Sequence, residues 1–194
     1  MGKLSNKVAV ITGGSAGIGK ASAFLFAKDG CAVGIIDINE TDGEQVAQEI
    51  RRSGGKATFI KADVSNADQL EAAIEAFADE FGGIDILYNN AGGATPRDDH
   101  LLKMPLDEFD HSIGLNLFGP FAACKFAIPH MDKRGGGSII NTASIRAMIG
   151  TSGADGYTSA KGGIVAPIAL FFACADSGWV TGQILPVDGG ACMN

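Results

Sequence analysis

Tyr157 and Lys161 are the residues of this sequence whose types and spacing most directly suggest chemistry. A separation of four positions places both side chains on one face of a helix, so they can act on the same small volume. A free phenol has a pKa of about 10, but a nearby ammonium group favours the phenolate. Tyr157 is therefore a candidate general acid/base, and Ser144 could donate a hydrogen bond to the same substrate oxygen.

A glycine-rich turn near the start of the sequence suggests a place for a bulky anion. Residues 8–11 form a short apolar run, residues 12–19 supply the glycines, and residues 18–28 have a helical pattern. Successive glycines let the backbone turn sharply and approach an anion closely, and the first turn of the helix directs unpaired N–H groups toward it. The strand, turn and helix together predict a pyrophosphate site.

An acidic residue follows the turn at the distance that a dinucleotide fold requires. A second apolar run, residues 32–36, ends in Asp37, eighteen positions beyond Gly19. A carboxylate at this place accepts hydrogen bonds from the adenosine ribose hydroxyls of NAD, and its charge would repel the extra phosphate of NADP. Asp37 therefore favours NAD as the cofactor, with NADP as the weaker alternative.

Apolar runs and helical patterns alternate along the first half of the sequence. Strand patterns follow at residues 57–61 and 84–88, and helical patterns at residues 41–52 and from a cap at Ser65 or Asn66 to residue 81. The alternation predicts a doubly wound parallel sheet with helices on both faces, a three-layer α/β/α fold in a single domain. Loops at the carboxyl ends of the strands should form the ligand crevice.

The second half of the sequence continues this plan. Residues 95–105 are expected to form an exposed loop, and residues 106–133 a long helix with a kink at Gly119 and Pro120. Residues 138–141 predict a fifth strand, which leads to Ser144, and Tyr157 begins another helix. Tyr157 and Ser144 thus come from neighbouring elements.

Composition excludes several classes of protein. The chain has 194 residues, 46% of them hydrophobic, and a net charge of −7, with no basic run that could neutralise nucleic-acid phosphates. No apolar segment has the length of a membrane span or of a signal sequence, so a soluble cytoplasmic protein is expected. The four cysteines and three histidines have no ligand or disulfide spacing, so no metal site is expected.

The ordered set of motifs resembles the short-chain dehydrogenase/reductase family, over residues 7–166 and again over residues 167–190. The motifs that carry the resemblance are Thr12-Gly13-x-x-x-Gly17-x-Gly19, Asp63, Asn89-Asn90-Ala91-Gly92, Asn116, Ser144, Tyr157-x-x-x-Lys161 and Pro186-Val187-Asp188-Gly189-Gly190. The resemblance implies a Rossmann fold with strand order 3-2-1-4-5-6-7. It also implies hydride transfer between NAD(H) and a secondary alcohol or ketone.

The resemblance assigns a role to each catalytic candidate. Tyr157 would exchange the proton at the substrate oxygen, and Ser144 would polarise and orient that oxygen. Lys161 would lower the pKa of the phenol and hold the nicotinamide ribose, and Asn116 would order a water that links Lys161 to solvent.

The resemblance also implies which residues contact the cofactor. Asp63 and Val64 would face the adenine, and the segment Asn90-Ala91-Gly92 would pack beside the cofactor. NADP-using relatives tend to place a basic residue where this sequence has Ser15, Ile38 or Asn39. The full set of implied cofactor contacts is Gly13, Ser15, Gly17, Ile18, Gly19, Asp37, Ile38, Asp63, Val64, Asn90, Ala91, Gly92, Tyr157 and Lys161.

The sequence departs from the family pattern after Lys161. Only 21 positions separate Lys161 from Gly182, which leaves room for one helix and for neither a sixth family strand nor a substrate lid. Either an internal segment near Ala166 and Pro167 is missing from this sequence, or the protein has lost it. A true deletion would expose the flank of a hydrophobic sheet, which favours the first explanation. The second would leave a catalytically impaired NAD-binding protein that acts through assembly.

The motifs leave the substrate and the oligomeric state open. A 3-oxoacyl thioester, a sugar or polyol, and a cyclic alcohol all fit the mostly small or apolar residues that follow the predicted strands. The resemblance implies a homo-oligomer, a tetramer or dimer. Phe118, Phe121 and Phe126 suit either such an interface or the core.

Overall fold

A computed structural model describes residues 2–149 and 152–172 of the chain. These residues form two compact units: a sheet unit, residues 2–92 and 118–142, and a helical unit, residues 93–117, 143–149 and 152–172. All the predicted strands that the structure describes belong to the sheet unit. The single domain expected from the sequence stays a prediction.

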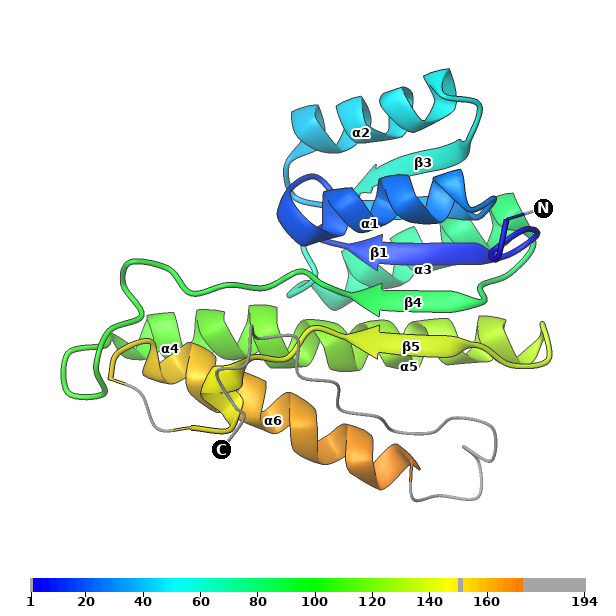
Figure 1. Ribbon diagram of the computed structural model, residues 1–194. Helices are drawn as coiled ribbons and strands as arrows, with labels where there is room; N and C mark the ends of the chain where they lie inside the picture. Colours follow the sequence, from blue (N-terminus) through cyan, green and yellow to red (C-terminus); the bar gives the residue numbers. More distant parts are fainter. Residues whose placement is uncertain (1, 150–151, 173–194) are drawn as a thin grey trace. The chain divides into compact units, whose positions relative to one another are not determined.

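The sheet unit is built on five parallel strands (Figure 1). The strands are β1 (Val8–Thr12), β2 (Ala32–Asp37), β3 (Lys56–Lys61), β4 (Ile86–Asn89) and β5 (Ser138–Asn141), in the order β3-β2-β1-β4-β5. The register aligns Val10 of β1 with Gly34 of β2 on one side and with Leu87 of β4 on the other. The central strand β1 is wholly buried, because helices cover both of its faces. The predicted doubly wound order is confirmed for these five strands.

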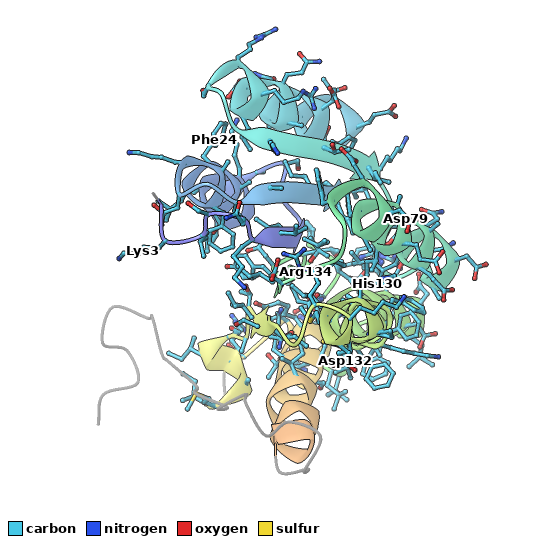
Figure 2. All side chains as sticks on the ribbon, turned by 90° about the vertical axis from the view of Figure 1, so that its right-hand side faces the viewer. Lys3, Phe24, Asp79, His130, Asp132 and Arg134 are labelled. Atoms are coloured by element: carbon cyan, nitrogen blue, oxygen red, sulfur yellow. The ribbon has the colours of Figure 1, made fainter. Side chains whose placement is uncertain are left out.

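Four helices cover the sheet: α1 (Gly17–Lys28), α2 (Glu40–Arg52), α3 (Ala67–Phe81) and α5 (Gly119–Asp132). Figure 2 looks toward the amino ends of the strands and shows α1, with Phe24, and α3, with Asp79, on opposite sides of the sheet. Helix α3 begins where the side chain of Asn66 accepts a hydrogen bond from the N–H of Gln69. It ends at Gly82, which has a positive φ of 78°. The sequence predicts both ends.

The core of the sheet unit depends on a close contact between helix and strand. A Cβ atom at Gly34 would lie 2.7 Å from the ring of Phe77, a fully buried side chain of α3. Glycine in β2 therefore makes room for a large aromatic ring that fills the space between α3 and the sheet.

The helical unit contains α4 (Leu106–Ile113), the 3-10 turn η2 (Ile145–Ala147) and α6 (Asp155–Phe172). A π-helical turn, η1 (Gly114–Phe118), follows α4 and leads along the chain into α5. The irregular turn ends directly before Gly119 and Pro120, where the sequence predicts a kink, and Pro120 lies in the first turn of α5.

The expected last strand and the motif of residues 186–190 lie outside the described residues. Within residues 2–149 and 152–172, no helix is long and apolar enough to cross a membrane. The side chains of Phe118 and Phe121 are 38% and 63% exposed, so neither belongs to the core of the sheet unit.

Candidate active site and dinucleotide cradle

The glycine turn is joined to the loop after β4 by a set of hydrogen bonds. The hydroxyl oxygen of Thr12 accepts 3.1 Å bonds from the main-chain N–H groups of Asn90 and Ala91. In return, the side-chain amide of Asn90 donates to the carbonyl of Gly13 at 3.0 Å. Gly13 has a φ of +67°, and a Cβ atom there would lie 2.8 Å from the Cα of Ala91. The two loops thus fit together only because position 13 has no side chain.

The first turn of α1 is free of side chains that would compete with an anion. Ala16 at the N-cap has no polar side chain, and the first turn contains no acidic residue. A Cβ atom at Gly19 would collide with the carbonyl oxygen of Gly13. The glycines therefore bring the turn against the helix, whose N-terminal N–H groups favour an anion.

Asp37 is the last residue of β2, as the sequence predicts. One of its carboxylate oxygens accepts hydrogen bonds from the N–H of Ser15, at 3.0 Å, and from the Ser15 hydroxyl, at 2.6 Å. The other oxygen accepts from the N–H of Asn39 at 3.0 Å. The acidic group is thus attached to the glycine turn. The side chains of Ile18 and Ile38 are both 66% exposed.

Asp63 and Val64 follow β3. The Asp63 carboxylate accepts bonds of 2.8 and 2.7 Å from the N–H and hydroxyl of Ser65, which fixes the turn before α3. Val64 is buried, and a Cβ atom at Gly119 would lie 3.0 Å from its side chain. Both residues therefore lie in a turn after the third strand, and their contact with adenine stays a prediction.

The four residues implied as catalytic all belong to the helical unit. Asn116 lies in η1 and is fully buried, and its side chain exchanges two hydrogen bonds with the main chain of Gly93, at 2.8 and 3.0 Å. Its amide also donates to the carbonyl of Ser112 at 3.1 Å. Asn116 thus holds the loop that begins at Gly93 against the helix.

Tyr157 and Lys161 lie one turn apart on α6. The ammonium nitrogen of Lys161 is 5.7 Å from the centroid of the Tyr157 ring, close enough for a cation–π contact. Burial lowers the pKa of the Lys161 ammonium to about 8, because removing the charge from water disfavours it. The two side chains are therefore close together on one face of α6, and their catalytic roles stay a prediction.

Ser144 lies at the N-cap of η2, a turn that packs against α6. Its hydroxyl oxygen accepts a 3.2 Å bond from the N–H of Arg146. The guanidinium of Arg146 in turn donates to the carbonyl of Gly153 at 2.7 Å, in the segment that precedes α6. Arg146 thus ties η2 to the start of the helix that carries Tyr157.

The structure adds a residue that the sequence interpretation missed. Asp98 lies in the loop predicted to be exposed, but its side chain is only 6% exposed. Its carboxylate accepts bonds from the Ser112 hydroxyl at 3.0 Å, from Gly156 N–H at 3.0 Å and from Tyr157 N–H at 2.8 Å. No local pattern could reveal this, because the partners on α6 lie 58 and 59 positions along the chain.

The described residues contain no group of three or more His, Cys, Asp and Glu side chains that could hold a metal ion.

Comparison with protein families matches residues 7–171 to the family described as short chain dehydrogenase. The match covers most of the chain, and the chain belongs to this family.

Several proteins are similar to this chain. An uncharacterized oxidoreductase, YxbG, of Bacillus subtilis is 43% identical over 164 residues, which are 84% of this chain and 59% of that protein. The 3-oxoacyl-[acyl-carrier-protein] reductase FabG of Chlamydia pneumoniae is 40% identical over 84% of this chain and 65% of its own length. The chain thus spans about three fifths of the length of these relatives.

A solved structure has a similar fold. It is a 7 alpha-hydroxysteroid dehydrogenase complexed with NADH and 7-oxo glycochenodeoxycholic acid, at 33% identity and a TM-score of 0.84. The match covers 90% of this chain and 67% of that one.

Proposed function

We propose that this chain belongs to an NAD-dependent oxidoreductase that interconverts a secondary alcohol and a ketone, with Tyr157 as general acid/base. The observation that carries the proposal is the buried ammonium of Lys161, 5.7 Å from the ring of Tyr157. A positive charge at this distance stabilises a phenolate, which is the form that accepts a proton from an alcohol.

The residues of the sheet unit fit a dinucleotide. Gly13 and Gly19 leave space that a Cβ atom would fill, and the first turn of α1 has neither a polar cap nor an acidic residue. These are the features that a pyrophosphate needs. We propose that the dinucleotide binds to the predicted cofactor residues of the sheet unit, which are Gly13, Ser15, Gly17, Ile18, Gly19, Asp37, Ile38, Asp63, Val64, Asn90, Ala91 and Gly92. When bound, the nicotinamide supplies or accepts the hydride.

Asp37 supports NAD over NADP. A carboxylate can accept about four hydrogen bonds, and the Asp37 carboxylate accepts three, two of them from Ser15. Accepting both ribose hydroxyls would therefore require the Ser15 hydroxyl to turn away. A 2′-phosphate would instead meet the negative charge of Asp37. We expect Asp37→Ser to weaken NADH binding more than tenfold and to narrow the preference for NADH over NADPH.

The helical unit supplies the proton chemistry. In the reducing direction the Tyr157 hydroxyl donates its proton to the carbonyl oxygen, and in the oxidising direction the phenolate takes the proton from the alcohol. Ser144 donates a hydrogen bond that orients this oxygen. Both N–H donors of the Asn116 side-chain amide are engaged with the carbonyls of Gly93 and Ser112. A water held by this side chain would use the second lone pair of its oxygen, which already accepts one bond from the N–H of Gly93.

The test combines cofactor binding with turnover. Wild type should enhance NADH fluorescence and reduce a ketone from a panel that includes a 3-oxoacyl thioester, a cyclic ketone and an oxidised polyol. Tyr157→Phe should retain NADH binding within a few-fold and lose turnover by about 10²–10⁴-fold, whereas Tyr88→Phe should remain active. Turnover retained by Tyr157→Phe would overturn the proposed role.

We propose a carbonyl on a bulky acyl or cyclic compound as the substrate. The similarity to a 3-oxoacyl reductase and to a hydroxysteroid dehydrogenase supports this class. A homo-oligomer, tetramer or dimer, is proposed on the exposure of Phe118 and Phe121, and light scattering of the purified protein tests it.

A second candidate function depends on the short connection after Lys161. The sequence predicts that an internal segment near residues 166–167 is missing, and the relatives are longer than this chain, as that prediction requires. An intact mass of the purified protein clearly above 19.9 kDa would show that the protein contains a segment that this sequence lacks. A mass equal to that value would favour an NAD-binding protein without turnover that acts through assembly.

A further inference from the structure

We infer that Asp98 is a positioning residue that sets the place of the Tyr157 phenol by holding the first turn of α6. The inference rests on the proposed role of Tyr157 as acid/base, but the contacts that carry it do not depend on any substrate. The carboxylate accepts hydrogen bonds from two successive N–H groups of α6, those of Gly156 and Tyr157. Asp98 therefore holds Tyr157, the residue that would exchange the proton, directly through the main-chain N–H of Tyr157.

A carboxylate suits this position for a physical reason. The first N–H groups of a helix have no partner within it, and the helix dipole favours a negative charge beside them. Asp98 is 6% exposed, so its charge would be costly without partners, and three donors satisfy it. An asparagine would keep one acceptor oxygen and would place N–H donors against N–H donors.

The backbone before α6 is held by the same residue. Ala154 has a φ of +52°, which an L-residue other than glycine adopts at a cost of about 1 kcal/mol. Its N–H donates to the carbonyl of Asp98 at 3.0 Å, and its own carbonyl accepts the N–H of Thr158 at 2.9 Å. The main chain and side chain of Asp98 thus fix the entry into α6 and stabilise this unfavourable conformation.

A further contact prevents the first turn of α6 from shifting toward α4. A Cβ atom at Gly156 would lie 3.1 Å from the Cβ of Ser112 and 3.1 Å from the sulfur of Met104. The Ser112 hydroxyl donates to Asp98, and its carbonyl accepts from Asn116. A continuous chain of hydrogen bonds therefore links Asn116, through Ser112 and Asp98, to the main chain of Tyr157.

The test uses the fact that the sequence contains only two tyrosines, Tyr88 and Tyr157. Protein labelled with 3-fluorotyrosine should give two fluorine resonances, and Tyr88→Phe assigns them. Asp98→Asn should shift or broaden the Tyr157 resonance, whereas Asp99→Asn, the same charge change on an exposed neighbour, should leave it in place. Ser112→Ala, which removes one donor to Asp98 and changes no residue of α6, should produce a smaller change of the Tyr157 resonance.

The kinetic arm separates positioning from general loss of structure. Because a displacement of about 1 Å can cost about 100-fold in rate, Asp98→Asn should lower kcat by about 10- to 100-fold with KM for NAD within about twofold of wild type. A Tyr157 resonance unchanged by both Asp98→Asn and Ser112→Ala would overturn the inference. So would a fall in kcat no larger than that of Asp99→Asn. If the wild type turns over no substrate, the proposed function fails, and the fluorine spectra still decide the role of Asp98.

Discussion

The ammonium nitrogen of Lys161 lies 5.7 Å from the centroid of the Tyr157 ring, and the lysine side chain is only 2% exposed. Burial lowers the pKa of Lys161 from 10.5 to about 8, so the lysine loses its charge near the pH at which many dehydrogenases are assayed. The charge that favours the Tyr157 phenolate is therefore half lost at about pH 8 and declines further above it.

The lowered pKa of Lys161 predicts how stability changes with pH. Between about pH 8 and 10.5 the unfolded chain keeps a proton on Lys161 that the folded protein has released. The free energy of unfolding should therefore rise with pH across this window through the contribution of Lys161. Urea unfolding of wild type and Lys161→Met from pH 7 to 10.5 measures it. Parallel pH profiles of the two proteins would contradict the prediction.

The collision at Gly19 predicts an unusual effect of alanine in a helix. Glycine to alanine inside a helix ordinarily stabilises by up to about 1 kcal/mol. Gly19→Ala should instead destabilise by about 1–3 kcal/mol and abolish NADH binding, because its Cβ meets the carbonyl of Gly13. The matched control is Gly162→Ala in α6, where a Cβ meets no atom of the described residues within 4 Å and the ordinary gain is expected. Urea midpoints and NADH fluorescence give both readouts, and equal effects of the two variants would refute the steric argument.

Asp85 predicts acid sensitivity of the sheet unit. Its buried carboxylate, just before β4, accepts hydrogen bonds from Lys7, the N–H of Val8 and Arg134, which is labelled in Figure 2. Burial alone would raise the pKa of Asp85, but these hydrogen bonds outweigh it and hold the pKa below 3.8. The stabilisation is therefore complete above the unfolded value and is lost as pH falls through the lower folded value.

Asp85→Asn should cost about 2 kcal/mol at pH 7, because it leaves two cations without their anion. The difference from wild type should shrink as the pH falls below about 4, the reference value for an aspartate. Asp107→Asn is the control, since Asp107 pairs with Arg97 at 2.6 Å on the exposed surface. It should change the urea midpoint little. A loss at Asp107 as large as that at Asp85 would show that burial is not the cause.

Two cysteines should be unreactive in the folded protein. Burial raises the pKa of the Cys31 thiol to about 12 and that of Cys124 to about 11, so neither forms the reactive thiolate at neutral pH. In a Cys174→Ser/Cys192→Ser background, Ellman's reagent at pH 8 should label no thiol before unfolding and two thiols in urea. Rapid labelling of the folded protein would contradict the burial of one of them.

Most of the sheet unit can be predicted from the sequence, because short runs of neighbouring residues mark its strands and the ends of its helices. Apolar runs define the strands, and Asn66 and Gly82 mark the two ends of α3. The role of the Asp37 carboxylate could be predicted from the number of residues that separate it from the glycine turn. The π-helical turn before Pro120 was not predicted, because its hydrogen bonds differ from an α-helix by a single position that no residue type marks.

The role of Asp98 could not be predicted for a different reason. Its neighbours are charged and polar, which is typical of an exposed loop, and its partners on α6 are distant in sequence. Contacts of this kind become visible only when the fold brings the segments together. The catalytic candidates Tyr157 and Lys161 could be predicted from the sequence, because their spacing follows the period of a helix.

The order of strands in the sheet also bears on how the chain can fold during synthesis. Strand β2 pairs with β1, β3 with β2, β4 with β1, and β5 with β4. Each of these five strands therefore finds its partner already made, and among the described residues none of them must wait for a later strand. The sheet can grow outward from β1, first on one side and then on the other, at the pace of translation.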